Sequence, residues 1–407
     1  MCLVRHSVLL ASNRTNFRDK VLPPESQSLS PLGFSVLHKA MSLEQQIRRQ
    51  VAALGFTLCG FTRLSPLPRE QFFADWLADG HAGEMIYLAR EPQRRITPTI
   101  PFPEAKSVIC LGYPYAPPRV PEIDWRRELR GRIAAYAAGV DYHDTIQTKL
   151  RTLVAYLQET VPGLWARPYV DTGPLFEREW AYRSGLGWFG KNTMLLHKGA
   201  GSWFFLAEIL VSFELEGEGI PQAHCGTCTR CLTDCPTGAL EGGYILKAPL
   251  CISYLTIEHR GPIPHELRPK LGNWIFGCDI CQEVCPWNEK FAARQEDLVE
   301  ELFPSLTELT ALDEDGFRNR FGRSAIRRTK RRGLLRNVAV ALGNSGNPEA
   351  IPSLQTVLLD PEPLVRSHAA WALGRFQEKE ARTTLEQHLS CEEHEEVRNE
   401  IEMALSV

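Results

Sequence analysis

The stretch that decides the fold of the middle of this chain reads Cys225-Gly-Thr-Cys-Thr-Arg-Cys-Leu-Thr-Asp-Cys235-Pro236. Its four cysteines follow the spacing C-x2-C-x2-C-x3-C-P. Iron needs soft thiolate ligands, and two-residue gaps let three sulfurs on one loop converge on a cluster while a fourth ligand comes from elsewhere. The spacing therefore predicts an iron–sulfur module.

A second, incomplete run follows and supplies the other half of the pattern. It consists of Cys251, then Cys278, Cys281 and Cys285 before Pro286. This is the ligand run of bacterial-type ferredoxins, in which the cysteine before proline serves the other cluster. We therefore expect two 4Fe-4S clusters in a ferredoxin-like module over residues 221–290. Their expected ligands are Cys225, Cys228, Cys231 and Cys285 for one cluster, and Cys235, Cys251, Cys278 and Cys281 for the second.

Two other uses of these cysteines remain open at this point. A pair of structural zinc sites would use two C-x2-C pairs, but zinc does not explain the paired x3-C-P tails. Disulfides would need an oxidising compartment, for which the sequence carries no signal. The four remaining cysteines are scattered and are expected to be ordinary small apolar residues, namely Cys2, Cys59, Cys110 and Cys391.

Length and composition limit the kind of protein. The chain has 407 residues, enough for two or three domains of roughly 150 residues. A net charge of -3 excludes a globally basic nucleic-acid coat, so a polyanion site has to be local. No apolar stretch reaches the roughly 18 residues of a membrane span, and the start has no clear secretory signal. We expect a soluble, cytoplasmic protein without a membrane partner.

The front of the chain predicts a mixed domain. Residues 1–40 lack periodicity and are expected to be a flexible extension, with Met41 a candidate start. Ser42 and Gln45 form a capping box before a helical pattern. Short apolar runs at 56–61, 107–113 and 204–213 indicate strands, and patterns at 145–159 and 174–184 indicate helices, the latter starting at Pro174. This alternation predicts an α/β domain over residues 41–220.

The end of the chain predicts a helical repeat. Val338-Ala-Val-Ala-Leu-Gly343 recurs as His368-Ala-Ala-Trp-Ala-Leu-Gly374, and prolines at 348 and 361 stand in the expected connections. The pattern is typical of a short HEAT-like, all-α solenoid over residues 291–407, in which each unit buries its apolar stripe against its neighbours. A plain helical bundle is the alternative.

A basic run opens this repeat. Nine cations occur between Arg318 and Arg336 with no acidic residue among them. On a chain of net charge -3, such a run predicts a local site for phosphates, although most basic runs are merely solvated surfaces. The candidate nucleic-acid contacts are Arg327, Arg328, Lys330, Arg331 and Arg332.

Three further motifs precede the cysteine runs, and the order of all these motifs along the chain resembles that of a known family. They are Asp141-Tyr-His143, the segment Val170-Asp-Thr-Gly-Pro-Leu-Phe-Glu-Arg178, and Gly185-Leu-Gly-Trp-Phe-Gly-Lys-Asn-Thr193. With these motifs the sequence resembles the epoxyqueuosine reductases over residues 41–407. The resemblance implies a cobalamin-binding catalytic domain, two 4Fe-4S clusters that recharge the cobalamin, and a tRNA-binding repeat. The implied reaction reduces epoxyqueuosine to queuosine at the wobble position.

The resemblance also implies roles for single residues. Asp171 would be the proton donor, and the alternative is a carboxylate at a helix N-terminus. The implied cobalamin contacts are Arg95, His143, Lys191, Asn192 and Thr193, for which a structural histidine and a plain turn are the alternatives. The expected partners are a tRNA anticodon stem-loop carrying epoxyqueuosine and a low-potential electron donor such as ferredoxin or flavodoxin, acting on a monomer.

Two other functions remain open from sequence alone. A cobalamin-dependent reductive dehalogenase would share the front domain and the clusters, but it has little need of a basic repeat. A HEAT-type scaffold with an electron-carrier insert would bind no corrinoid.

Overall fold

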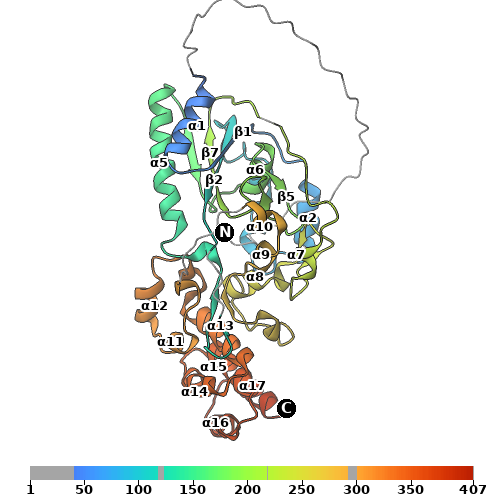
Figure 1. Ribbon diagram of the computed structural model, residues 1–407, viewed down its shortest axis with the longest axis vertical. Coiled ribbons are helices and arrows are strands. Elements are labelled where there is room, and N and C mark those ends of the chain that lie inside the picture. The colour runs from blue at the N-terminus through green and yellow to red at the C-terminus, as the bar shows by residue number, and fades with distance from the viewer. Residues whose placement is uncertain (1–40, 118–122, 218, 292–299, 407) are drawn as a thin grey trace, which may run out of the picture.

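The computed structural model describes residues 41–117, 123–217, 219–291 and 300–406. The predicted extension over residues 1–40 lies outside this range. The described chain is elongated, with a sheet domain at one end, the cysteine-bearing loops in the middle and a helical array at the other end (Figure 1).

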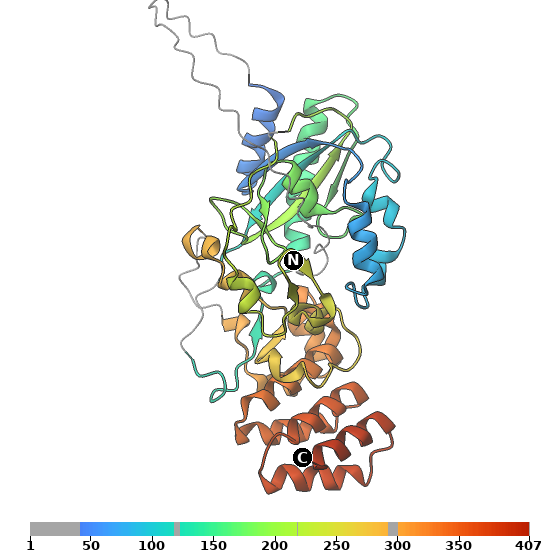
Figure 2. The same cartoon turned by 90° about the vertical axis from the view of Figure 1, so that its right-hand side faces the viewer.

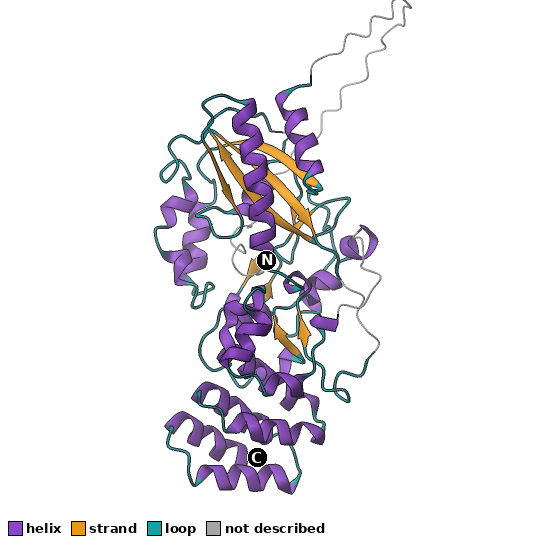
Figure 3. Ribbon diagram, turned by 90° about the vertical axis from the view of Figure 1, so that its left-hand side faces the viewer, coloured by secondary structure: helices purple, strands orange, loops and turns teal. Residues whose placement is uncertain are grey.

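A four-stranded sheet forms the front domain. Its order is β1-β2-β7-β4, and every neighbouring pair is antiparallel; the strands are β1 (Leu58–Arg63), β2 (Ser107–Pro114), β7 (Phe204–Val211) and β4 (Ala166–Tyr169). All eight residues of β7 are buried, because helices cover both faces of the sheet. On one face lie α1 (Leu43–Ala53) and α5 (Tyr142–Thr160), and on the other lies α6 (Glu177–Arg183) (Figures 1 and 3).

The sequence located these strands but not their direction. The three predicted strands, the helix at 145–159 and the Ser42 capping box are confirmed. The order of elements along the chain did not fix the direction of the strands, which the structure shows to be antiparallel throughout this sheet. The remaining elements of this domain are α2 (Glu70–Ala78), α3 (Ile86–Ala89), α4 (Pro92–Ile96), η1 (Ala135–Ala137), β5 (Trp188–Phe189) and β6 (Leu195–Leu196).

Short elements separated by loops carry the cysteines. Most of the module is irregular, which lets several thiols of one loop turn inward. Strand β10 (Trp274–Phe276) pairs in parallel with β3 (Arg132–Ile133) and so joins the module to the front domain. The other elements are α7 (Arg230–Thr233), β8 (Leu240–Glu241), β9 (Ile245–Leu246), η2 (Ala248–Leu250), α8 (Ile252–Ile257), η3 (Arg268–Leu271), α9 (Ile280–Glu283) and α10 (Pro286–Phe291).

The C-terminal part is all helical. Gly343 and Gly374, which close the repeated sequence motif, lie against Ala372 and Ala404 of the next unit, where a Cβ would come within 3 Å. The repeated glycines therefore let successive helices approach closely. The elements, which stack in pairs in Figure 2, are η4 (Glu300–Leu302), α11 (Leu306–Thr310), α12 (Glu314–Phe321), η5 (Ala325–Thr329), α13 (Lys330–Ser345), η6 (Pro348–Ala350), α14 (Ile351–Leu358), α15 (Pro363–Leu373), α16 (Lys379–Leu389) and α17 (Glu395–Ser406).

Within the described ranges, every helix is too short or too polar to cross a membrane.

Candidate active site

Asp141 and His143 form a pair at the start of α5. Asp141 is the N-cap of the helix and accepts a hydrogen bond from the backbone N–H of His143 at 3.1 Å. The same carboxylate accepts from His143 Nδ1 at 2.7 Å. Arg327 of η5 reaches the other oxygen of Asp141 at 3.0 Å. The N-cap therefore fixes the ring of His143 and ties it to the basic run.

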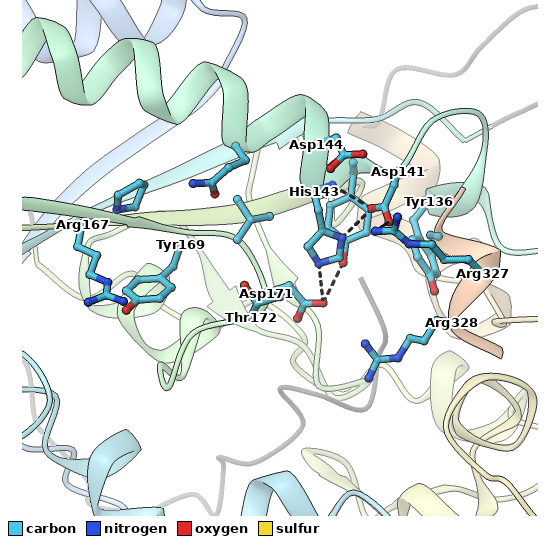
Figure 4. Close-up of a pocket in the computed structure, with 15 residues that line it drawn as sticks. Tyr136, Asp141, His143, Asp144, Arg167, Tyr169, Asp171, Thr172, Arg327 and Arg328 are labelled. Atoms are coloured by element: carbon cyan, nitrogen blue, oxygen red, sulfur yellow. Dashed lines mark hydrogen bonds and ion pairs between the residues drawn. The ribbon is translucent and has the colours of Figure 1, made fainter. Parts of the chain in front are cut away.

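Asp171 lies opposite this pair, in the bend that follows β4. Tyr142 donates its hydroxyl to Asp171 Oδ2 at 2.8 Å, and His143 Nε2 stands 3.7 Å from the same oxygen (Figure 4). The sequence pattern predicts a helix from Pro174, but α6 begins only at Glu177. Asp171 is therefore no N-terminal helix carboxylate, and that alternative is wrong.

The Asp171 bend is held in an uncommon backbone conformation. Asp171 has a φ of 54°, in the left-handed region that non-glycine residues rarely adopt. Its backbone N–H donates to the buried carboxylate of Glu177. Two residues on, Gly173 O accepts from Arg95 Nη1 at 3.1 Å. Strain at a buried functional residue persists only where its surroundings fix it, and Glu177 and Arg95 provide that fixation here.

The carboxylates set the protonation of this network. Burial lowers the pKa of His143, but the hydrogen bonds and charges of Asp141 and Asp171 outweigh burial and raise it overall. Burial opposes ionisation of Asp141 as well, yet its bonds to His143 and the charge of Arg327 lower its pKa. Burial and the charge of Asp171 raise the pKa of Tyr142 well above its ordinary value. Near neutral pH the network thus favours a proton on His143 and another on Tyr142.

These side chains open onto a cavity of about 610 Å³. Its walls include the rings of Tyr136, Tyr142 and Tyr169, and its rim includes Arg167, Arg327 and Arg328. The cavity therefore has aromatic walls and arginines at its rim, and its lining also includes the carboxylates of Asp141, Asp144 and Asp171. An anionic nucleotide fits such a rim, and a flat conjugated ring system fits such walls.

Two predicted cobalamin contacts have other partners. Lys191 Nζ donates to Gly226 O and Cys228 O, both at 2.8 Å. Asn192 Nδ2 donates to Cys281 O at 3.1 Å. Both side chains thus support the cysteine loops through backbone carbonyls, and their role as cobalamin contacts stays a prediction. Thr193 is buried with a φ of 65°, and its hydroxyl has no hydrogen-bond partner among the described residues.

The eight predicted ligands fall into two groups in space. The first thiol group is Cys225, Cys228, Cys231 and Cys285, which together line a hollow of about 320 Å³. The second thiol group is Cys235, Cys251, Cys278 and Cys281. Burial raises the pKa of Cys231 to about 12, with contributions from the other three thiols of its group. Burial likewise raises the pKa of Cys281, next to Cys278 and Cys251 and also to Cys231 and Cys235. The two groups are therefore neighbours.

The basic run is not the unpaired patch that its sequence indicates. Arg331 is buried in an ion pair with Asp360, so it is withdrawn from the predicted nucleic-acid contacts. Arg328 pairs with Glu258 at 2.6 Å, and Arg332 lies 3.9 Å from Glu362. Lys330 is exposed. Counter-charges distant in sequence thus neutralise much of the run, while Arg327 and Lys330 still face the solvent.

Comparisons with known proteins agree with this arrangement. Family models match at residues 95–172 (Epoxyqueuosine reductase QueG, DUF1730), 224–288 (4Fe-4S double cluster binding domain) and 323–406 (HEAT repeats). The epoxyqueuosine reductase of Xanthomonas campestris is 40% identical over 339 residues, which is 81% of this chain and 95% of that protein. That of Escherichia coli is 38% identical and covers 83% of this chain and 90% of that protein. The chain belongs to the epoxyqueuosine reductase family.

Solved structures of epoxyqueuosine reductases share the fold. One, bound to an epoxyqueuosine-modified tRNA-Tyr stem loop, has a TM-score of 0.82 at 31% identity and covers 89% of this chain and 98% of that chain. The Bacillus subtilis enzyme, captured with an aspartate-bearing catalytic loop swung out of its active site, has a TM-score of 0.82 at 30% identity, with coverage of 89% and 98%.

The predicted iron–sulfur module and HEAT repeat are confirmed for this epoxyqueuosine reductase family member. The match to a 4Fe-4S double-cluster domain favours iron–sulfur clusters over the alternative of two structural zinc sites. None of the described cysteines forms a disulfide bond. The HEAT match replaces the plain bundle. The assignment of each cysteine to one cluster stays a prediction.

Sequence reasoning missed the carboxylates behind Asp171. Glu177 holds the Asp171 backbone, and Glu208 lies fully buried in β7 beside Glu177. Burial, then the charge of Glu177, raises the pKa of Glu208 well above its ordinary value, which favours the neutral form of this residue. The available signal was the interruption of an apolar strand by one glutamate, because such a residue is seldom fully buried without a partner.

Proposed function

We propose that this chain reduces epoxyqueuosine to queuosine in the anticodon loop of tRNA. The observation that carries the proposal is the position of Asp171, which faces a cavity with tyrosine walls and arginines at its rim, beside two groups of four thiols. Membership of the epoxyqueuosine reductase family supports it, as does the tRNA stem loop bound by a solved relative. The reaction consumes two electrons and two protons: the epoxide C–O bonds break, an alkene forms and the oxygen leaves as water.

The thiol groups provide a route for the electrons. Each group would supply four thiolates, which is the number of soft ligands that a 4Fe-4S cluster takes. The second group lies next to the cavity wall: Gly277, which precedes Cys278, packs against Ala134 and Tyr136, and Tyr136 lines the cavity. The first group lines a hollow on the outside. Electrons would therefore pass from the first group to the second and on to the cavity.

The cavity also fits a corrinoid. Its tyrosine walls suit a flat macrocycle. The buried hydroxyl of Thr193 lacks a partner in the described chain, but Thr193 is not among the residues that line this cavity. When bound, cobalamin supplies the low-potential centre that no side chain offers for reductive opening of an epoxide. Tyr136 and Tyr169 are the residues of this cavity that would hold it, and Arg95 would act indirectly by fixing the Asp171 bend. Both nitrogens of His143 face carboxylates, which favours proton handling over a cofactor contact for this residue.

The residues around Asp171 would manage the protons. A leaving alkoxide is a poor product at neutral pH, so a positioned acid has to protonate the oxygen as the bond breaks. Asp171 would donate this proton, and Tyr142 orients its carboxyl through the 2.8 Å hydrogen bond. His143, whose ring stands 3.7 Å away, would return a proton to Asp171. Asp141 and Arg327 would keep the His143 ring aimed at Asp171.

The test is product formation by the anaerobically reconstituted protein. Wild type, Asp171→Asn and the surface control Asp75→Asn are incubated with cobalamin, a chemical reductant and epoxyqueuosine-containing tRNA, and nucleosides are identified by mass spectrometry. We expect Asp171→Asn to slow queuosine formation by about 10²–10⁴-fold without weakening tRNA binding, as for loss of a general acid. Equal rates for all three proteins would remove Asp171 from its role. No queuosine from wild type with intact clusters and bound cobalamin would reject the function.

Three further expectations belong to this proposal. The electrons would come from a low-potential one-electron donor of the ferredoxin or flavodoxin kind. A monomer suffices for every step, since the cavity and both thiol groups are built by one chain. A cytoplasmic location would bring the protein together with its tRNA substrate.

A further inference from the structure

The two thiol groups differ in their access to the outside. In the first group three of the four cysteines are partly exposed, namely Cys225, Cys228 and Cys231. In the second group Cys251 and Cys278 are buried, and Cys235 and Cys281 are partly exposed. Only the first group lines an open hollow among the cavities described above. An external electron carrier can therefore approach the first group more closely than the second.

The hollow has a one-sided charge. Its lining includes Lys191, Arg230 and Lys290, together with His224, and contains no carboxylate. The side chain of Arg230 is 59% exposed, and Lys290 is exposed as well. Glu289, beside the hollow, pairs with Arg230 at 3.4 Å. The mouth of the hollow is thus cationic within a chain of net charge -3.

Two aromatic rings, those of His224 and Trp287, also line the hollow, and Trp188 is buried behind them. Trp188 contacts Trp287 and His224 edge to face, at centroid distances of 4.9 and 4.8 Å. His224 is exposed, whereas Trp188 is buried beside Cys285. A small apolar centre with a charged rim is the usual make-up of a transient protein contact, and redox partners bind through small surfaces of this kind.

We propose that this hollow is the docking surface for an acidic protein that delivers one electron at a time to the first thiol group. The proposal rests on the proposed function, because it assumes that the thiol groups carry clusters. In each encounter the carrier is oxidised by one electron and the cluster is reduced by one, and no bond is formed or broken. The cations attract the carrier over distance, and His224 and Trp287 contact it beside the cluster.

A second role for the same cations has to be separated from docking. A cluster with four thiolates is itself anionic, so Arg230 and Lys290 could act only by stabilising its reduced form. That role would change the reduction potentials and affect every reductant. Docking, in contrast, changes the reaction with an acidic protein and leaves a small chemical reductant unaffected.

The experiment measures cluster reduction in the holoprotein by stopped-flow absorbance, without tRNA. The probe is a reduced, acidic [2Fe–2S] ferredoxin, and dithionite serves as the small reductant. The variants are Arg230→Glu and Lys290→Glu, with Lys270→Glu as the control, since Lys270 is an exposed lysine of η3 at the repeat side of the same module. Glu289→Lys adds a cation at the mouth, and Lys290→Arg keeps the charge.

We expect each reversal to lower the second-order rate constant with ferredoxin roughly tenfold at low salt and to weaken its salt dependence. Glu289→Lys should raise the rate, Lys290→Arg and Lys270→Glu should match wild type, and dithionite should reduce all variants alike. Calorimetric titration with oxidised ferredoxin should show the same order of affinities.

Three results would overturn docking at this hollow. The first is an unchanged rate of reduction by ferredoxin in both Arg230→Glu and Lys290→Glu, and the second is an equally lowered rate in Lys270→Glu. The third is a lowered rate that is fully explained by a change in the midpoint potentials of the clusters. Weaker tRNA binding in the reversals with normal reduction by ferredoxin would also overturn it, and would assign the surface to tRNA. Queuosine formation driven by dithionite is scored separately, so rejection of docking leaves the proposed function standing.

Discussion

At the scale of single residues, His143 gives the cavity a pH dependence whose sign can be stated. Its pKa is raised in the folded protein by Asp141 and Asp171 against the effect of burial. A histidine whose pKa is raised by folding stabilises the folded state, and this contribution is complete when the pH is below the ordinary pKa of 6.5. The contribution is lost as the pH rises through the pKa of the folded protein. We therefore expect His143→Asn to lower the free energy of unfolding more at pH 6 than at pH 9, measured by anaerobic denaturant titration.

His197 provides the matched control for this prediction. Burial lowers its pKa, so its contribution has the opposite sign and grows as the pH rises past 6.5. The difference between wild type and His197→Asn should therefore increase from pH 6 to pH 9. If the two histidine variants showed the same trend with pH, the assigned environment of His143 would be wrong.

Residue type alone was enough to find some of these side chains and insufficient for others. Asp171 and His143 stand in motifs, and the cavity brings them together. The side chains of Lys191 and Asn192 can donate hydrogen bonds to a cofactor or to a backbone carbonyl. Only the folded chain shows that they donate to the carbonyls of Gly226, Cys228 and Cys281. The same holds for Glu208, whose partner Glu177 comes from a distant element.

At the scale of elements, α13 links the basic run to the second thiol group. Buried Asn337 donates to Thr256 O of α8 at 2.9 Å and to Ile275 O of β10 at 2.8 Å. Helix α8 starts directly after Cys251, and β10 ends two residues before Cys278. One amide thus fixes the two segments that carry half of the second thiol group.

Replacing Asn337 should loosen that group. Asn337→Ala removes the side-chain donor to Ile275 O, at a cost of about 1–3 kcal/mol for a buried group left unsatisfied, whereas Thr256 O keeps its hydrogen bond from Thr329 Oγ1 at 3.0 Å. We expect faster iron release to a chelator and earlier loss of one of two cluster signals in electron paramagnetic resonance. Asn344→Ala is the control, because Asn344 also bridges two carbonyls from α13, those of Arg268 and Gly272, away from the cysteines. Equal iron release from both variants would contradict this specific role.

Element positions followed from sequence more reliably than element ends and directions. The capping box of Ser42 and the apolar periods of α5 are local signals, and both were confirmed. The start of α6 depends on the contact between Asp171 and Glu177, and the antiparallel sheet depends on how long connections return. Neither is encoded in a short window of residues.

At the scale of the whole molecule, the basic run shows why charge has to be judged in three dimensions. Its sequence contains no acidic residue, yet Asp141, Glu258, Asp360 and Glu362 reach it from other parts of the fold. Two exposed cations, Arg318 and Lys330, and the partly exposed Arg332 line a groove of about 490 Å³ together with Glu314 and Glu362, and this groove shares Arg327 with the rim of the active-site cavity. A nucleic acid lying in this groove would lead directly to Asp171.

This arrangement predicts different outcomes for neighbouring cations. Lys330→Glu and Arg332→Glu should weaken tRNA binding, and each should reduce the slope of log K against log salt by about one, because one phosphate contact is lost. Arg331→Met should leave that slope unchanged and instead destabilise the repeat, by about 3–5 kcal/mol, because the buried Asp360 loses its partner. Filter binding over a salt series and thermal unfolding separate the two effects. A reduced slope for Arg331→Met, or an unchanged slope for Lys330→Glu, would contradict the assignment of the groove to the tRNA backbone.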